Sequence, residues 1–365
     1  MIYTKFGDTN LSVSVLGFGT MRLPIRPVNA DFSPAIRLIR HAIERGINYF
    51  DIGTFYCHHQ AETAFGLATK DIERDRLLIS GKNSTHQYGA DSWLQQLQHS
   101  LALFERDYFD IYFIHYLNLE QWQNHFIKKS ILHQVQEALE SGLVRHLGFS
   151  SHDTPENVRR IIDSGWFAAV ILQFNLLQRK YESVMRYAFE SGLGVMTMNP
   201  LAGGALVDAN LYLTENAQNH DDHKTAESAL KFVLSQPFIH SVLSGMQSIE
   251  IIDANVHTVH QKNFSQKEIQ HLNQRISEEK VKLLIPCNGC NYCMPCPQGI
   301  DIPAVLKIWN QYNILQGNKM YSREYEALPV PAECCIHCES CQDKCPQQIA
   351  IPDRMDEASE LFSQL

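Results

Sequence analysis

Eight short apolar runs, each followed by an amphipathic stretch of helical length, recur between residue 15 and about residue 260. Many of the helical stretches stop at a glycine, as in Arg45-Gly46, which is typical of a helix that ends before the next strand. Eight such units within the ~250 residues typical of a barrel favour a closed parallel barrel over a doubly wound open sheet. The expected strands are 15–19, 47–52, 77–81, 111–115, 144–150, 169–174, 193–198 and 240–243.

The helical stretches and the first residues complete this expectation. Residues 2–6 and 11–15, around Gly7-Asp8, predict a β-hairpin that is expected to plug the N-terminal end of the barrel. A polar, charged helix over residues 266–280 is expected to lead the chain away from the barrel. The helices between the strands are expected at 34–45, 61–70, 92–105, 131–141, 155–164, 182–191, 224–235 and 249–260.

Composition narrows the classes of partner. The chain has 365 residues, 44% of them hydrophobic, and a formal net charge of −9. It can therefore bury a large core, but this charge does not favour nucleic acid as a partner. No run of about 18 apolar residues is present that would span a membrane, and the first residues lack the layout of a signal peptide. We expect a cytoplasmic protein with reduced thiols and with neither nucleic-acid nor membrane partners.

Nine of the ten cysteines fall between Cys287 and Cys345. Eight of these nine form two runs, each with three cysteines at strict threes and a fourth directly before a proline, Pro297 or Pro346. Three thiolates at this spacing on a tight loop can bind three irons of one cube, whereas a cysteine before proline typically binds the other cluster of a pair. The eight candidate ligands are Cys287, Cys290, Cys293, Cys296, Cys335, Cys338, Cys341 and Cys345.

These runs predict two 4Fe–4S clusters. Crossed ligation joins Cys345 to the first run and Cys296 to the second. Local ligation exchanges these two cysteines and remains open, because the last spacing of the first run is one residue shorter than that of the second. Structural zinc is the alternative, since Cys-x2-Cys pairs suit zinc, but two runs of four favour iron–sulfur. Cys334 is out of register and is expected not to bind.

The cysteine region contains an internal repeat. The segment 296–303, Cys-Pro-Gln-Gly-Ile-Asp-Ile-Pro, is similar to 345–352, Cys-Pro-Gln-Gln-Ile-Ala-Ile-Pro, and each copy leads into a predicted helix. The spacer between the runs also has helical character. The expected fold class is therefore α/β, with a (β/α)8 TIM barrel over residues 1–280 and an appended, mostly α-helical ferredoxin-like domain over residues 281–365.

Four ionisable residues stand at or just after the ends of neighbouring predicted strands: Asp51, Tyr56, Lys82 and His115. Active sites of barrels lie at the C-terminal ends of the strands. Tyrosine, with a reference pKa near ~10, keeps a proton that it can donate at neutral pH, and a lysine ammonium stabilises the tyrosinate that remains. An aspartate can hold that lysine, and a histidine can orient a carbonyl. The sequence therefore predicts a site for proton transfer to a carbonyl oxygen.

This constellation resembles the aldo-keto reductase family over roughly residues 1–262. The motifs that carry the resemblance are Leu16-Gly-Phe-Gly-Thr20, Phe50-Asp51 with Tyr56, Gly81-Lys82, Ile114-His115 and Gly148-Phe-Ser150. The resemblance implies that the four residues form a catalytic tetrad. It also implies reversible hydride transfer between a nicotinamide cofactor and a small carbonyl or alcohol substrate.

The resemblance also implies contacts to NADP or NAD. Ser150 and Gln173 match positions that bind the carboxamide, and Met198 stands where the family has a ring-stacking aromatic residue. Thr20 and Asn255 match further cofactor positions. Where the family has a lysine and an arginine for the 2′-phosphate of NADP, this chain has glycine and isoleucine, at 245 and 251. NAD therefore becomes an alternative to NADP.

The combined prediction is an aldo-keto reductase fused to a two-cluster ferredoxin-like domain, as in a bacterial group of such fusions. In the first hypothesis, the clusters transfer electrons and imply a redox protein as a further candidate partner. In the second, they serve only structure or redox sensing. In the third, the chain is a non-enzymatic electron-transfer subunit, against which the intact tetrad counts. The sequence does not name the substrate or the oligomeric state.

Overall fold

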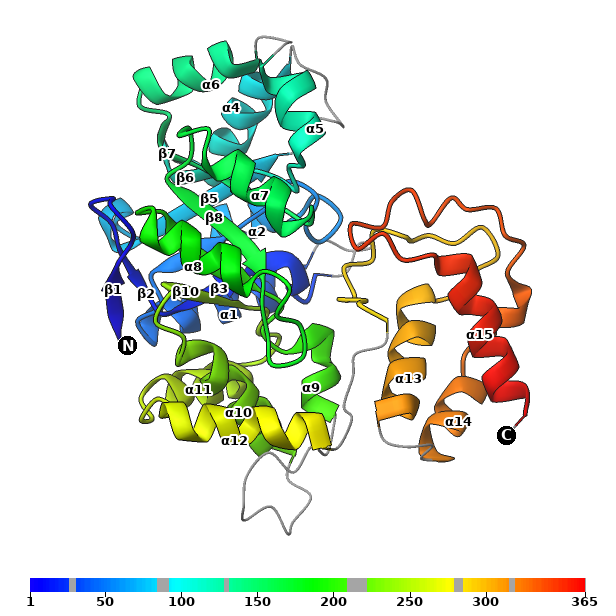
Figure 1. Cartoon of the computed structure of the whole chain (residues 1–365). Coiled ribbons are helices and arrows are strands. Elements are labelled where there is room, and N and C mark those ends of the chain that lie inside the picture. The colour runs from blue at the N-terminus through cyan, green and yellow to red at the C-terminus, as the bar shows by residue number, and fades with distance from the viewer. Residues whose placement is uncertain are drawn as a thin grey trace. The chain divides into compact units, whose positions relative to one another are not determined.

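The computed structural model describes residues 1–25, 31–83, 92–127, 131–208, 222–278, 285–314 and 319–364. The chain divides into two compact units (Figure 1). The first contains Met1–Phe174, Arg179–Pro200 and Val233–Asn263, and the second contains Asn175–Gln178, Leu201–Phe232 and Phe264–Leu365. The domain boundary predicted at residues 280 and 281 lies outside the described residues and stays a prediction. Among the described residues, no helix is long and apolar enough to cross a membrane.

Eight parallel strands close into a barrel, as predicted. Their order is β10-β3-β4-β5-β6-β7-β8-β9, and β10 pairs with both β3 and β9 to close the ring. Every predicted apolar run overlaps one of these strands, which shows that the eightfold repeat decides the fold. The strands are β3 (Leu16–Gly19), β4 (Tyr49–Asp51), β5 (Leu78–Asn83), β6 (Phe109–Ile114), β7 (Val144–Ser150), β8 (Ala169–Gln173), β9 (Gly194–Met198) and β10 (Ser241–Ser244).

Amphipathic helices follow the strands at the predicted places. In α1 the buried side chains recur every three or four residues, as in Ala35, Leu38 and Ala42, so that one apolar stripe faces inward. Thr154 caps α7 by accepting a hydrogen bond from the Asn157 N–H. The helices are α1 (Ser33–Glu44), α2 (Ala61–Thr69), α4 (Trp93–Phe104), α5 (Leu119–Gln121), α6 (Ile131–Glu140), α7 (Pro155–Ile162), α8 (Glu182–Glu190), α9 (Ala205–Asp208), α10 (Asp222–Leu234), α11 (Ile249–Val259) and α12 (Gln266–Glu278).

The predicted hairpin is present and covers one end of the barrel. Strands β1 (Tyr3–Lys5) and β2 (Ser12–Ser14) pair antiparallel. The Asp8 N–H donates to the carbonyl of Gly192, just before β9 begins, and the buried Phe6 ring lies against Gly194. The hairpin therefore covers the N-terminal ends of the strands. The C-terminal ends remain for a site.

The C-terminal part of the second unit is helical where it is described. Its helices are α13 (Ile302–Ile314), α14 (Lys319–Glu326) and α15 (Ile351–Ser363) (Figure 1). The start of α13 or α15 follows each cysteine run, as the sequence repeat predicts. A buried core that includes Ile300, Val305 and Met355 joins these helices. Six cysteines pack against this core, namely Cys287, Cys293, Cys296, Cys335, Cys341 and Cys345.

The two cysteine runs repeat the same backbone conformation. Two residues after the first cysteine, Gly289 and His337 have φ of 64° and 53°. Two residues further on, Asn291 and Glu339 have φ of 65° and 59°. Left-handed residues of this kind let a chain curl tightly. Both loops therefore wrap around the space that their cysteine side chains share.

Candidate functional site

A buried ion pair lies at the C-terminal end of the barrel. The Lys82 Nζ atom donates to Oδ2 of Asp51 at 2.8 Å, and the two side chains are 3% and 4% exposed. The Ser80 hydroxyl donates to the other carboxylate oxygen, Oδ1, at 3.1 Å. Strands β4 and β5 bring these residues together because they are hydrogen-bonded neighbours in the ring. Asp51 therefore holds the lysine in one place.

Tyr56 and His115 lie beside this ion pair. The Lys82 Nζ atom is 5.3 Å from the centroid of the Tyr56 ring. The Tyr56 and His115 rings meet edge to face, with their centroids 6.1 Å apart. The structure thus brings all four predicted tetrad residues together, from the ends of β4, β5 and β6. Each is largely buried.

Gly53 makes the approach of tyrosine and lysine possible, and the sequence analysis missed it. A Cβ atom at this position would lie 3.1 Å from Cε1 and Cζ of Tyr56 and 3.2 Å from Cγ of Lys82. These distances are shorter than ordinary van der Waals contacts. A glycine two residues after a strand-end aspartate is the sequence signal that indicates such a close approach.

The turn after Tyr56 is conformationally unusual. Cys57, His58 and His59 have φ of 52°, 56° and 65° in succession. The Cys57 Sγ atom lies 3.4–3.6 Å from the carbonyl oxygens of Thr20, Met21 and Leu23, to which its S–H can donate. Burial raises the pKa of this thiol to about 11. Cys57 therefore stays protonated at neutral pH and ties the turn to the segment after β3.

The residues predicted to contact a nicotinamide also stand at the ends of barrel strands. Ser150, Gln173 and Met198 are the last residues of β7, β8 and β9. Thr20 follows β3, and its hydroxyl donates to the Asp51 carbonyl at 3.0 Å. The Ser150 hydroxyl accepts the Tyr116 N–H at 2.9 Å. All four strand ends face the same mouth because the strands of the ring are parallel.

His152, two residues after Ser150, is a further residue near Lys82 that was not predicted from the sequence. Burial, with the nearby cations of Lys180 and Lys82, lowers the pKa of this imidazole to about 4. The imidazole is therefore neutral at physiological pH. The two cations act on it from β5 and from the segment before α8.

The segment after β10 carries the last predicted cofactor residue. Asn255 on α11 donates to the Ser244 hydroxyl at 3.1 Å. A Cβ atom at Gly245 would lie 3.5 Å from Cδ of Arg22, so that an arginine from the segment after β3 lies where the local sequence offers no cation. Asp253, which looks unfavourable to a phosphate in sequence, is paired with His41 and Arg45 at 2.8 and 2.9 Å.

The cysteines of the second unit interact in two groups of four. Burial raises the pKa of Cys293 to about 12, with further contributions from the thiolates of Cys290, Cys287 and Cys345. Cys345 thus interacts with the first run although it belongs to the second.

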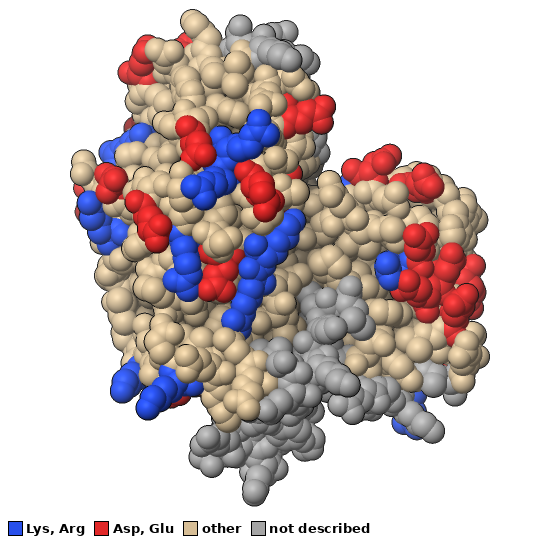
Figure 2. Space-filling model, in the orientation of Figure 1, with Lys and Arg blue, Asp and Glu red and all other residues tan. Residues whose placement is uncertain are grey.

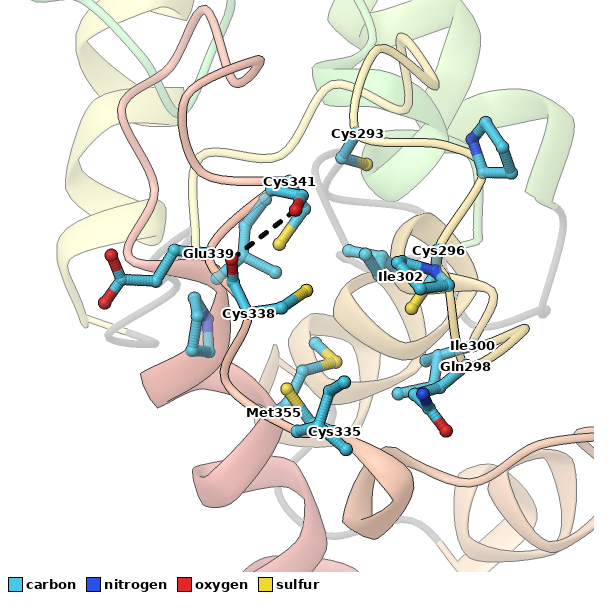
Figure 3. A pocket seen from close by; sticks show the side chains of 16 residues that line it. Cys293, Cys296, Gln298, Ile300, Ile302, Cys335, Cys338, Glu339, Cys341 and Met355 are labelled. Carbon is cyan, nitrogen blue, oxygen red and sulfur yellow. Dashed lines mark hydrogen bonds between the residues drawn. The ribbon is translucent and has the colours of Figure 1, made fainter.

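Cys296, which belongs to the first run, interacts in turn with the cysteines of the second run. Burial raises the pKa of Cys341, with further contributions from Cys335, Cys338 and Cys296. A small pocket is lined by these four cysteines and by Cys293. Figure 3 shows the sulfur atoms of Cys296, Cys338 and Cys341 directed into the same space.

Two helical side chains anchor the starts of the runs. The buried Asn310 of α13 accepts the Ile285 N–H at 3.0 Å and donates to the Ile285 carbonyl at 2.8 Å, two residues before Cys287. The Tyr325 hydroxyl of α14 accepts the Ala332 N–H at 2.9 Å, three residues before Cys335. Both loops therefore start from fixed points.

The side chains of the described residues form no preformed site for a metal ion. In the part of the chain that the structure describes, no three or more histidine, cysteine or carboxylate side chains lie close enough together to hold one ion. The ligands of a four-iron cube bind different irons and stand further apart than the ligands of one tetrahedral ion. A four-iron cluster therefore does not require its four thiols to meet around one point.

Comparisons with known proteins match the barrel. Residues 15–276 match the model of the Aldo/keto reductase family. The chain is 23% identical over 309 residues to YqkF, an uncharacterized oxidoreductase of Bacillus subtilis. The alignment covers 76% of this chain and 97% of that protein. It is 26% identical over 341 residues to L-glyceraldehyde 3-phosphate reductase of Escherichia coli, which covers 78% of this chain and 94% of that enzyme.

Solved structures show the same fold. An aldo/keto reductase of Klebsiella pneumoniae in complex with NADP and acetate has a TM-score of 0.63 and 21% identity, over 74% of this chain and 94% of that one. The family match ends at residue 276, before the first cysteine run begins at Cys287. It therefore accounts for the barrel and leaves the cysteine loops to be explained from their own geometry.

Proposed function

The chain belongs to the aldo/keto reductase family and is an oxidoreductase, and from this premise we propose that it reduces a small carbonyl compound, or oxidises the corresponding alcohol, with NADP(H). The observation that carries the proposal is the buried 2.8 Å ion pair of Lys82 and Asp51 next to the Tyr56 ring. Four groups suited to one proton transfer meet at one barrel mouth.

Each side chain has a distinct part in this proposal. When bound, the nicotinamide supplies or accepts the hydride. Tyr56 donates its hydroxyl proton to the carbonyl oxygen and takes it back in the reverse direction. Lys82 stabilises the tyrosinate, and Asp51 keeps the ammonium in place. His115, whose ring meets the Tyr56 ring edge to face, orients the carbonyl.

The proposed cofactor contacts are Thr20, Ser150, Gln173, Met198 and Asn255. NADP is favoured over NAD because Arg22 lies next to Gly245, where a 2′-phosphate would otherwise meet no cation. A charge-assisted hydrogen bond to phosphate contributes about 1.5–3 kcal/mol, or roughly 10- to 100-fold in affinity. Arg22→Gln should weaken NADPH binding by that factor and leave NADH binding unchanged. An equal loss for both would assign Arg22 to the shared diphosphate.

Tyr56→Phe tests the catalytic proposal. This change removes the hydroxyl and keeps the ring that packs against Gly53, so the fold should be preserved. We expect kcat for carbonyl reduction to fall by about 100-fold or more, as is usual when a general acid is lost, while the affinity for NADPH stays the same. Carbonyl reduction at the wild-type rate would refute the proposed role of the tyrosine.

We also propose that the second unit holds two 4Fe–4S clusters with crossed ligands. Such a cluster supplies one-electron transfer when bound. The two interacting groups of thiols support this assignment. One cluster would be held by Cys287, Cys290, Cys293 and Cys345, and the other by Cys335, Cys338, Cys341 and Cys296.

Single cysteine variants distinguish crossed from local ligation. In the crossed arrangement, Cys345→Ala and Cys290→Ala disturb the same cluster, so their reduced proteins should retain the same electron paramagnetic resonance spectrum. Local ligation would instead make Cys345→Ala resemble Cys338→Ala. Cys334→Ala, next to a ligand but out of register, is the matched control and should keep both clusters.

A second candidate is that the clusters serve only structure or redox sensing. Packing of six cysteines against the core of the second unit favours a structural contribution. Anaerobic addition of NADPH and a carbonyl substrate separates the two candidates. Bleaching of the cluster absorption during turnover indicates electron exchange, and unchanged absorption indicates a structural or sensing role.

A further inference from the structure

The two cysteine loops differ in what surrounds them. Between Cys287 and Cys296 the chain contains no charged residue, and most of these residues are half-buried. In the second loop, all residues from 336 to 340 are exposed, and the large apolar side chain of Ile336 is 60% exposed. The loops repeat one backbone conformation but face different environments.

The first loop is covered by another segment of its own unit. A Cβ atom at Gly203 would lie 3.0 Å from the Asn288 Cα atom, and the φ of Gly203 is +69°. Gly203 precedes α9, which contacts α13 in the same unit. The backbone next to Cys287 is thus covered by protein, and an external protein has no access from this side.

The second loop is surrounded by acidic side chains. Exposed carboxylates stand at Glu333, Glu339, Asp343, Asp353 and Asp356, and in Figure 2 acidic side chains gather on the face of the second unit that carries α15.

Few cations offset these carboxylates. Lys344, directly after Asp343, is an exposed cation of this loop. His337 is bonded to Asp356 at 3.0 Å, and Arg354 is bonded to Glu357. Figure 3 shows the Glu339 carboxylate directed away from the cysteine sulfurs. The loop therefore presents an apolar side chain within a negatively charged rim, next to proposed iron ligands.

We propose that residues 336–343 form the docking surface for a one-electron redox protein whose own redox centre lies in a basic face. This inference rests on the proposed clusters and states through which loop they exchange electrons with a partner. The cluster held by Cys335, Cys338, Cys341 and Cys296 exchanges one electron with that partner. The carboxylates attract the basic face, and Ile336 supplies the apolar contact at its centre.

Ferric cytochrome c, a small basic redox protein, is the probe for this surface, and ferricyanide is its anionic counterpart. The holoprotein is reduced with dithionite, and the rate of oxidation of its clusters by each probe is measured at low salt. The double variant Glu339→Lys, Asp343→Lys reverses two charges of the rim. Electrostatic steering typically changes association rates by 10-fold or more, so we expect cytochrome c to react at least about fivefold more slowly and ferricyanide faster.

A matched control separates local from net charge. Glu137 and Glu190, exposed on α6 and α8 of the first unit, allow the double variant Glu137→Lys, Glu190→Lys, which makes the same net charge change elsewhere. Ile336→Ser should slow cytochrome c without altering the rate with ferricyanide. The binding of ferric cytochrome c to the oxidised protein, followed by analytical ultracentrifugation, gives a readout that needs no electron transfer and should weaken in Glu339→Lys, Asp343→Lys.

The outcomes separate this inference from the proposed function. Protein that contains no iron and sulfide refutes the clusters themselves. Protein with both clusters, in which Glu137→Lys, Glu190→Lys slows cytochrome c as much as Glu339→Lys, Asp343→Lys does, overturns the docking surface. An unchanged rate of cluster oxidation by cytochrome c in Glu339→Lys, Asp343→Lys also overturns it. A wild-type dimer that this double variant abolishes overturns it as well, because a second copy of the chain then occupies the surface.

Discussion

Replacing Gly53 with alanine tests whether the tyrosine is held at a fixed distance from the lysine. The added Cβ atom would lie 3.1 Å from two carbon atoms of the Tyr56 ring, whereas ordinary contacts begin at 3.4 Å. The ring must therefore move by the difference, roughly 0.3 Å. The backbone at Gly53 is not left-handed, so alanine adds no strain of its own.

The expected effect follows from this displacement. A misplacement of 1 Å can cost about 100-fold in rate, so roughly 0.3 Å should lower kcat about fourfold, equivalent to ~0.8 kcal/mol of transition-state stabilisation. The NADPH dissociation constant should change less than twofold. Single-turnover reduction of a carbonyl substrate, monitored by NADPH absorbance, measures the step directly.

Gly142→Ala is the control for a general loss of stability. Gly142 has a φ of +76° and nothing within 4 Å of its Cβ position, and it lies between α6 and β7, at the opposite end of the barrel. Alanine there should cost about 1–2 kcal/mol of stability and leave kcat unchanged. If Gly53→Ala keeps the wild-type kcat, the reasoning about a fixed tyrosine is wrong.

Three further changes test other parts of the structure. Burial raises the pKa of the Glu62 carboxyl to about 7, so the free energy of unfolding declines as the pH rises from about 4.5 to 7. Urea unfolding should show a loss of ~2 kcal/mol between pH 5.5 and 8 in the wild type that is missing in Glu62→Gln. The same pH dependence in both proteins would contradict this. Gln348→Gly, at a φ of 52° where the repeat has Gly299 at 77°, should stabilise the second unit by about 1 kcal/mol, which thermal unfolding measures. Asn310→Ala leaves two backbone groups of Ile285 unpaired and should destabilise this unit by roughly 2–4 kcal/mol, with loss of iron from the first loop; full retention of iron would contradict the anchoring role.

The barrel was predictable because its signal is local and repeated. Each strand lies within or next to an apolar run, and each glycine stop separates a helix from a strand. Once the ring closes, the positions of Asp51, Lys82 and His115 at one mouth follow from their places at the strand ends.

The features that were missed depend on contacts between distant segments. Arg22 meets Gly245 only because β3 and β10 are neighbours where the barrel closes. The place of Gly53 two residues after a strand-end aspartate indicates a close approach, but only the fold shows that the Tyr56 ring lies against it. The anchoring of Ile285 by Asn310 gives no sequence signal, since an asparagine on a helix is usually exposed.

The most direct test is the iron and acid-labile sulfide content of the whole chain purified without oxygen. A chain that joins a hydride-transfer site to two four-iron clusters should contain about eight irons and eight sulfides, and it should reduce a carbonyl compound with NADPH. About two zinc ions per chain and no sulfide would contradict this prediction, because the two groups of cysteines would then hold structural metal alone.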